Sequence, residues 1–351
     1  MFEAMSLPIL LFIFAVAAIA IWFAGIQLSN ATDVLSERLG LGEALGGLIL
    51  LAIATNLPEI AITVSAALQH NLGIATGNIL GGIAIQTVVL VILDVFGVRV
   101  PLTYRAASLT LVLEGLLVIA VLIVAIMATQ LPRSLIFDRI APGGLLIAIL
   151  WIAGLWLIGK ARSDLPWREQ GNAPDSQASN RNSSHAKPNQ PKSTTLTRTW
   201  IVFLAASVVT LIAGVALEQT GDSIAHQVGV SGVLFGATVL AAATALPEVS
   251  TGLASVKLQD YQLAVSDIFG GNAFLPVLFL LATLISGETV LPRAEKTDIY
   301  IAGLGILLTV VYLYGLIFRS RQQVLRMGID SLIVLVLYVL GTIGLIAVTR
   351  S

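Results

Sequence analysis

Ten long apolar runs, separated by polar breaks, dominate the hydropathy pattern of the chain. A helix needs about 20 apolar residues to cross a hydrocarbon core roughly 30 Å thick, and these runs are of about that length. The pattern therefore predicts an all-α, polytopic membrane protein with ten transmembrane helices. The predicted spans are residues 8–29, 42–68, 72–97, 106–128, 142–159, 200–217, 231–257, 262–286, 298–318 and 329–349.

Composition agrees with this pattern. Of 351 residues, 57% are hydrophobic and only 11% are charged, against roughly 25% charged residues in soluble domains. This excludes a soluble enzyme and a nucleic-acid-binding protein, and makes the lipid bilayer the expected partner. The chain has no cysteine, so it has no disulfides or thiol chemistry. The run 8–29 follows no Lys or Arg and is too long for a signal peptide, so we expect an uncleaved span.

The basic residues predict an orientation. Fourteen of the 19 Lys and Arg residues fall on one side of the predicted topology, and the excess of basic residues marks the cytoplasmic side. Both termini are then outside the cell (plasma or inner) membrane. Residues 161–198, rich in Ser, Asn, Gln and Pro, predict a disordered cytoplasmic linker between residues 1–160 and 199–351.

The chain contains an internal repeat. Residues 54–59 read Ala-Thr-Asn-Leu-Pro-Glu, and residues 243–248 read Ala-Thr-Ala-Leu-Pro-Glu, at an offset of 189. At this offset residues 24–87 align without a gap with residues 213–276. Each half holds five predicted spans, and an odd number means that the second half inserts in the opposite orientation. Two inverted five-helix repeats are typical of secondary transporters, which bind their substrate at the repeat interface near the membrane midplane.

The repeated motif has the chemistry of a cation site. Pro58 interrupts helical hydrogen bonding, and the freed carbonyl groups are tolerated in a membrane only where they face protein or water. Glu59 follows the proline, and Thr55 lies one turn earlier; Thr244 and Glu248 repeat this spacing. Hard cations prefer such oxygen ligands. The alternative is a pair of kinked helices with neutral, hydrogen-bonded glutamates, but two copies favour a cation site.

Further polar residues accompany the motif. Asn78 and Asp267 are equivalent in the two halves and stand beside glycine pairs, whereas Gln86 has an apolar counterpart, Leu275. Asp267 is expected to flank the inner approach, as a functional carboxylate or a structural cap. Glu114, in the fourth span, fits a proton relay and a packing role equally well. The predicted cation-binding residues are Glu59, Glu248, Thr55, Thr244, Asn56, Asp267, Asn78 and Gln86.

At these motifs the chain resembles the calcium/cation antiporter superfamily, of the sodium/calcium exchanger type. Each family repeat carries Gly-Thr-Ser-x-Pro-Glu followed by Gly-Asn-x-x-Gly-Ser-Asn. The resemblance implies that Glu59 and Glu248 are the metal ligands for the transported cation, and that Thr55 and Thr244 supply further oxygens. It also implies that the first and sixth spans slide over a fixed core.

The chain departs from the family pattern at several ligand positions. The motif serines are replaced by Asn56 and Ala245, and the glycine-serine pairs by glycine pairs at 81–82 and 270–271. These losses argue against a faithful site for three sodium ions and one calcium ion. The fold and the antiport class are therefore expected from the resemblance, while the identity of the ions stays open.

The expected function is a secondary-active antiporter that exchanges calcium or another small cation for sodium or protons by alternating access. It would need no cofactor besides the transported cation, and Glu114 and Asp267 are its candidates for a proton relay. Two alternatives remain: a transporter-derived membrane protein that binds a cation without flux, and a membrane-embedded enzyme with paired acids. No Ser/His or metal-binding His pattern accompanies the acids, so catalytic residues are not predicted. The oligomeric state is left open.

Overall fold

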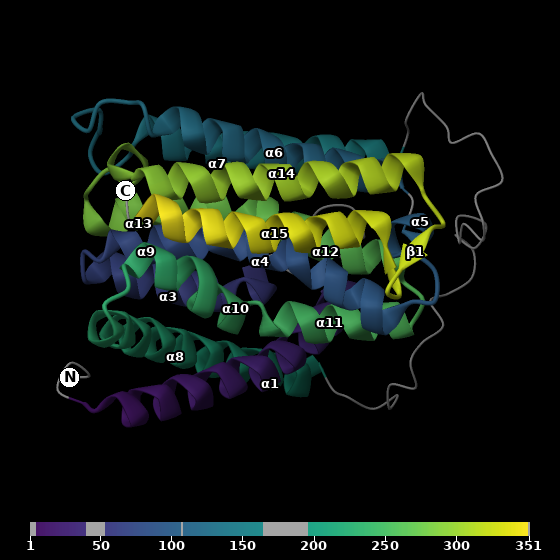
Figure 1. Cartoon of the computed structure of the whole chain (residues 1–351). Coiled ribbons are helices and arrows are strands. Elements are labelled where there is room, and N and C mark those ends of the chain that lie inside the picture. The colour runs from purple at the N-terminus through teal and green to yellow at the C-terminus, as the bar shows by residue number, and fades with distance from the viewer. Residues whose placement is uncertain (1–4, 40–52, 107, 164–195, 350–351) are drawn as a thin grey trace.

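The computed structural model describes residues 5–39, 53–106, 108–163 and 196–349 as long helices running side by side (Figure 1). The helices of the first half are α1 (Leu7–Leu39), α3 (Leu57–Leu68), α4 (Leu72–Gly97), α5 (Leu102–Arg105), α6 (Leu109–Ala128) and α7 (Pro142–Ser163). Those of the second half are α8 (Leu196–Val228), α9 (Gly232–Phe235), α10 (Ala241–Thr244), α11 (Leu246–Lys257), α12 (Tyr261–Phe274), α13 (Leu278–Ser286), α14 (Lys296–Phe318) and α15 (Ile329–Thr349).

Short irregular elements join some of these helices. A π-helical turn, Gly236–Leu240, connects α9 to α10, and 3-10 turns occupy Leu275–Val277 and Leu291–Arg293. Strands β1 (Gln323–Val324) and β2 (Met327–Gly328) pair antiparallel in a small hairpin before α15. The described chain is thus helical apart from this hairpin and an isolated bridge in the connection from α6 to α7.

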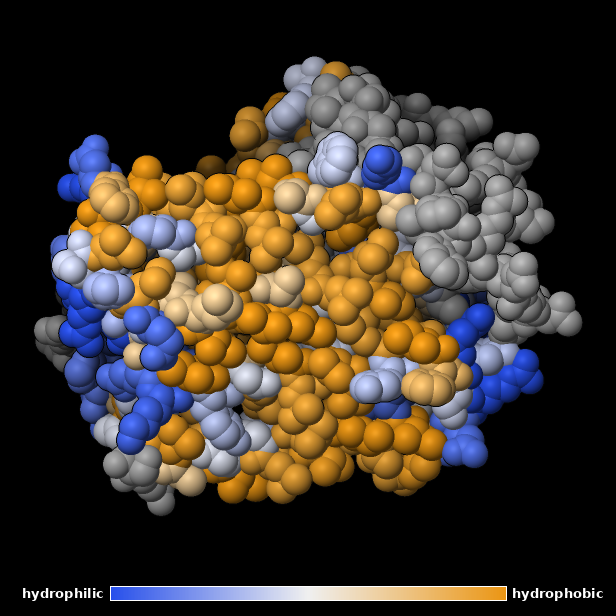
Figure 2. Space-filling model, turned by 90° about the horizontal axis from the view of Figure 1, so that it is seen from above, coloured by the Kyte–Doolittle hydropathy of each residue, from blue (hydrophilic) through white to orange (hydrophobic). Residues whose placement is uncertain are grey.

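Eight helices in the described ranges are long and apolar enough to cross a membrane, and the bent pair Gly232–Thr244 and Leu246–Lys257 makes up to nine. The second predicted span, 42–68, is described only from residue 53 onward, because residues 40–52 lie outside the described ranges. The full count of ten therefore stays a prediction. An apolar belt lies between hydrophilic ends on the face seen in Figure 2.

The helices that carry the first and sixth predicted spans continue beyond the predicted span ends, residues 29 and 217. Helix α1 continues to Leu39 and α8 continues to Val228. The polar residues that interrupt these apolar runs, such as Thr32 and Glu218, are only 1% exposed. They pack against neighbouring helices rather than lipid, so they do not end the helix.

Helices α1 and α8 pack lengthwise against each other along one side of the bundle, and α6, α7 and α14 lie on the opposite side (Figure 1). The repeat-bearing helices α3, α4, α11 and α12 lie between these two layers and contact one another. Helix α4 also packs against α14 and α15. The motif residues are therefore held in the interior of the bundle.

The two halves meet through reciprocal close contacts. A Cβ added to Gly25 on α1 would lie 2.6 Å from Cβ of Pro247. At the equivalent position of the second half, a Cβ on Gly214 would lie 2.6 Å from Cβ of Ala61 and 3.1 Å from the carbonyl oxygen of Pro58. Each half thus places its glycine on the proline region of the other half, as two repeats related by a pseudo-two-fold axis would do.

The chain enters and leaves the bundle at one end. The start of α1 and the end of α15 lie at the same end in Figure 1, whereas α7 finishes and α8 begins at the other. The amide of Gln227, near the end of α8, donates to the carbonyl oxygen of Met5 at 2.9 Å, which fixes α8 antiparallel to α1. Most of the predicted linker, residues 164–195, lies outside the described residues.

Candidate functional site

Each motif glutamate lies in the first turn of a half-helix. The helical residues 53–55 stop at Asn56, and α3 restarts at Leu57 with Pro58 in its first turn. The second half repeats this break at Ala245, where the axis bends by 40°. Proline is well suited to a first turn because its missing N–H has no intrahelical partner there. The positive end of each half-helix dipole therefore lies close to a carboxylate.

Gln86 connects the two glutamates. Its amide nitrogen lies 3.5 Å from Oε1 of Glu59 and 3.4 Å from Oε1 of Glu248. Glu59 is fully buried and Glu248 is 2% exposed. The hydroxyl of Thr244 also interacts with Glu59 across the repeat interface. The bend in each half thus brings its carboxylate to one shared position in the interior.

Several oxygens at this position are buried without a hydrogen-bond partner in the described structure. They are Oε2 of Glu59, Oε2 of Glu248 and Oε1 of Gln86. Buried polar atoms are nearly always satisfied in folded proteins, and a buried charge is paired, metal-bound or neutralised. These oxygens therefore form a set that a cation or protons would complete.

The remaining motif residues surround the two carboxylates. The side-chain amide of Asn56 lies 3.4 Å from the hydroxyl of Thr55. A Cβ on Gly271 would lie 3.2 Å from Nδ2 of Asn56 and from Oε1 of Gln86. Gly271 therefore borders the site, and only a residue of its size keeps this space open. Thr244 also donates to the carbonyl oxygen of Ala241 at 3.1 Å.

Three predicted site residues lie away from this centre. Asn78 is fully buried on α4, two turns before Gln86, and neither of its amide atoms has a hydrogen-bond partner. Asp267 is half-buried and accepts from the hydroxyl of Thr251 at 3.2 Å. Glu114 lines a separate cavity together with Asp267. The structure thus separates a central pair of acids from a peripheral pair.

The central site depends on two carboxylates and neutral oxygens. No group of three or more His, Cys, Asp or Glu side chains in the described ranges has the geometry of a metal site. At the position equivalent to Gln86, the second half presents Leu275, which is fully buried. The site is therefore symmetric in its acids and asymmetric in its neutral ligands.

Three acids that are buried in the described ranges were not among the predicted site residues: Glu218, Asp298 and Asp94, of which Asp94 was expected to reach the membrane interface. Glu218 on α8 accepts from Ser65 Oγ and from Gln69 Nε2, both at 2.8 Å. Asp94, fully buried near the end of α4, accepts from the backbone N–H groups of Leu102 and Gly328, both at 2.7 Å. Glu218 lies one residue beyond the predicted sixth span, so no pattern in the sequence marked it as buried.

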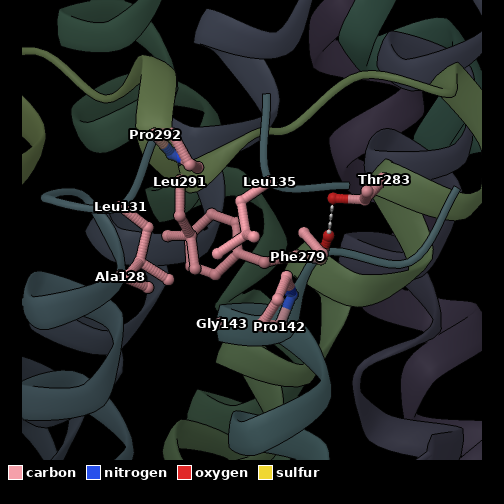
Figure 3. Close-up of a pocket in the computed structure, with 11 residues that line it drawn as sticks. Ala128, Leu131, Leu135, Pro142, Gly143, Phe279, Thr283, Leu291 and Pro292 are labelled. Carbon is pink, nitrogen blue, oxygen red and sulfur yellow. Dashed lines mark hydrogen bonds between the residues drawn. The ribbon is translucent and has the colours of Figure 1, made fainter. Parts of the chain in front are cut away.

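A further cavity, between the α6–α7 connection and α13, differs in character from the central site (Figure 3). Among its lining residues, Thr283 is the one with a polar side chain, and its hydroxyl donates to the carbonyl oxygen of Phe279 at 2.8 Å. This cavity has no carboxylate and only one polar side chain, so it lacks the charged ligands of the central site.

Comparison with known proteins gives consistent matches over nearly the whole chain. A family model described as "Sodium/calcium exchanger protein" matches residues 9–159 and 198–347. The inner membrane protein YrbG of Escherichia coli (strain K12) is 26% identical over 312 residues, which are 88% of each chain.

Two solved structures share the fold. Native YfkE has a TM-score of 0.66 and 18% identity, covering 95% of this chain and 91% of its own. The H+/Ca2+ exchanger CAX has a TM-score of 0.65 and 15% identity, covering 97% of this chain and 88% of its own. Each of the two segments matched by the family model contains one copy of the Pro-Glu motif.

Proposed function

We propose, from the premise that this chain belongs to the sodium/calcium exchanger protein family and is therefore an integral membrane cation antiporter, that it exchanges a divalent cation for protons. Calcium is the first candidate for the divalent ion. Members of this family are transporters rather than enzymes, and they move cations without a cofactor. The predicted class is thus established, and the ions are the subject of the proposal.

One observation carries the proposal: Gln86 joins two buried glutamates from the two halves of the chain. Each glutamate keeps one carboxylate oxygen without a hydrogen-bond partner. Two negative charges in the membrane interior are costly unless positive charge compensates them. One divalent cation or two protons would neutralise the pair equally, so the exchange of one for the other leaves the site charge nearly unchanged.

The neutral ligands favour protons over sodium as the counter-ion. A proton needs only a carboxylate oxygen, whereas metal ions need several oxygens around each ion. The second half offers fully buried Leu275 where the first half has Gln86, and Ala245 where it has Asn56. The glycine pairs beside the site contribute no hydroxyl group. Several sodium ions would therefore lack ligands that two protons do not require.

The proposal includes alternating access between two inverted repeats, residues 1–160 and 199–351. The reciprocal glycine contacts of Gly25 and Gly214 support this arrangement, because each half presses on the helix break of the other. Helices α1 and α8, which lie together along one side, are the candidates for the moving layer. We further propose that both termini are outside and that the 161–198 linker is cytoplasmic.

Transport by the purified full chain in proteoliposomes tests the proposal. Uptake of radiolabelled calcium is measured under an imposed pH gradient, an imposed sodium gradient, and neither. We expect uptake under the pH gradient alone. Uptake driven only by sodium would contradict the assignment of the counter-ion. Calcium binding without flux in any gradient would contradict antiport and support the cation-binding alternative.

A further inference from the structure

A partly open cavity lies between α6, α7 and α12, on the side of the bundle opposite to α1 and α8, with about 550 Å³ of empty space including its open mouth. In the proposed orientation, its lining residues lie toward the cytoplasmic ends of these three helices. Helix α12 contributes Leu263, which is 38% exposed, and Asp267, which is half-buried. The cavity is therefore open to the surroundings at the level of the first turns of α12.

The cavity wall combines apolar side chains with a small polar set. Glu114 from α6 and Asp267 and Ser266 from α12 contribute oxygens. Trp151 from α7 is 8% exposed, and its indole N–H has no hydrogen-bond acceptor in the described structure. A buried donor without an acceptor is rare. A water molecule in the cavity would satisfy this N–H, because buried waters occupy sites with several polar partners.

A glycine pair on α12 borders both this cavity and the central site. A Cβ on Gly270 would meet no atom within 4 Å, and Gly270 lines the cavity. A Cβ on the next residue, Gly271, would instead meet Asn56 and Gln86 of the central site. No side chain therefore stands on α12 between the cavity and the site at this level.

A polar connection runs alongside the glycine pair. The hydroxyl of Thr251 on α11 donates either to Oδ2 of Asp267 at 3.2 Å or to the backbone carbonyl oxygen of Glu248, one turn earlier on the same helix, at 3.3 Å. Acids spaced by water and hydroxyl groups form the usual chain for moving protons within a membrane.

We propose that this cavity is a water-filled side entrance through which protons reach Glu248 from the inner end. Glu114 and Asp267 are its proton-carrying groups: each takes up a proton from water and releases it to the next acceptor, and so returns to the carboxylate. The use of the entrance for protons rests on the proposed calcium/proton exchange, whereas the hydration of the cavity is independent of that exchange.

Cysteine labelling tests hydration without any transport measurement. The chain has no native cysteine, so Gly270→Cys introduces a single thiol. Gly303→Cys is the matched control, because a Cβ there also meets no atom within 4 Å, but Gly303 lies exposed on the outer surface of α14, in the span Lys296–Phe318. Thiols react with methanethiosulfonate reagents only as hydrated thiolates.

We expect the Gly270→Cys protein, reconstituted at full length, to react with a small positively charged methanethiosulfonate at least about tenfold faster than Gly303→Cys. Adding Glu114→Gln to Gly270→Cys should slow this reagent and leave a neutral reagent of similar size unchanged, because a nearby carboxylate concentrates cations. Equal rates at the two glycine positions would overturn the proposal. An unchanged rate for the charged reagent would remove Glu114 from the entrance.

A transport arm separates this proposal from the central-site assignment. Gly270→Leu fills the cavity without touching Glu59 or Glu248, so we expect calcium binding to be retained while uptake driven by the pH gradient falls several-fold. Unchanged uptake in Gly270→Leu would contradict the proton role of the entrance. If the central assignment is wrong instead, Glu248→Gln keeps its flux while Gly270→Cys still labels.

Discussion

The two halves of the central site carry the same acids but different neutral ligands. Glu59 and Glu248 occupy equivalent positions in the first turn of α3 and α11, and both are buried. Gln86 on α4 reaches both carboxylates, while its counterpart Leu275 contributes no polar atom. The pair of acids is thus what the repeat preserves, and the surrounding ligands are what distinguish the halves. Charge compensation is therefore the shared requirement of both halves.

The largest expected effect tests whether Glu59 and Glu248 are equally required for transport. Glu59→Gln and Glu248→Gln should each reduce calcium exchange by about 100-fold or more, because either change removes a ligand charge that no neighbour replaces. Exchange is measured as isotope uptake in proteoliposomes. Glu288→Gln is the control, since Glu288 lies at the surface in an ion pair with Arg293. If one of the two glutamine variants stayed active, the two glutamates would not be equivalent, and this comparison of the halves would be contradicted.

The second prediction concerns the neutral ligands. Gln86→Leu makes the first half resemble the second and removes the amide that contacts both carboxylates. A hydrogen bond to a charged group contributes about 1.5–3 kcal/mol, so calcium affinity should fall by roughly tenfold or more. Leu275→Gln is the reciprocal variant and should bind calcium at least as well as the wild type. Equal affinity in Gln86→Leu and the wild type would show that the asymmetry is without consequence.

The third prediction addresses how the halves press on each other. Gly214→Ala places a methyl group against Ala61 and Pro58, and overpacking of this kind costs about 1–3 kcal/mol. The thermal unfolding midpoint in detergent should therefore fall. The same is expected of Gly25→Ala against Pro247. Gly303→Ala has open space around its Cβ and should leave the midpoint unchanged or raised.

The smallest expected effect lies at a buried contact between α3 and α8 that has no equivalent between α11 and α1. Ser65→Ala removes one of two donors to the buried carboxylate of Glu218, and Gln69 remains as the other. The loss should be about 1 kcal/mol, visible as a modest decrease in the unfolding midpoint. Ser255→Ala on α11 serves as control, because that hydroxyl donates to Thr251 of its own helix. A larger loss in the control than in Ser65→Ala would contradict this assignment.

Hydropathy predicts much of the fold, and its failures have one physical cause. The predicted spans 72–97 and 329–349 coincide with α4 and α15, because their apolar runs end where the helices end. The ends of α1 and α8 are missed, since Thr32 and Glu218 are polar residues buried between helices. A hydropathy pattern records polarity along the chain and carries no information on whether a polar side chain meets lipid or protein.

The repeat predicts the residues of the central site better than their neighbours. The recurrence of Pro-Glu places Glu59 and Glu248 at one interface, and the structure joins them through Gln86. In the repeat alignment Gln86 has no polar counterpart in the second half, yet in the structure it contacts both acids. The pairing of Glu114 with Asp267 in one cavity depends on how α6 packs against α12, and no repeat signal encodes that packing.

The balance of charge at the central site is tested most directly by the dependence of transport on membrane potential. Calcium uptake driven by a fixed pH gradient is measured in proteoliposomes whose potential is clamped with potassium and valinomycin, at zero and at about 100 mV inside-negative. One calcium ion exchanged for two protons moves no net charge, so the account predicts the same rate at both potentials. A rate that rises with inside-negative potential would show net positive charge entering with calcium, and would contradict the balanced exchange at Glu59 and Glu248.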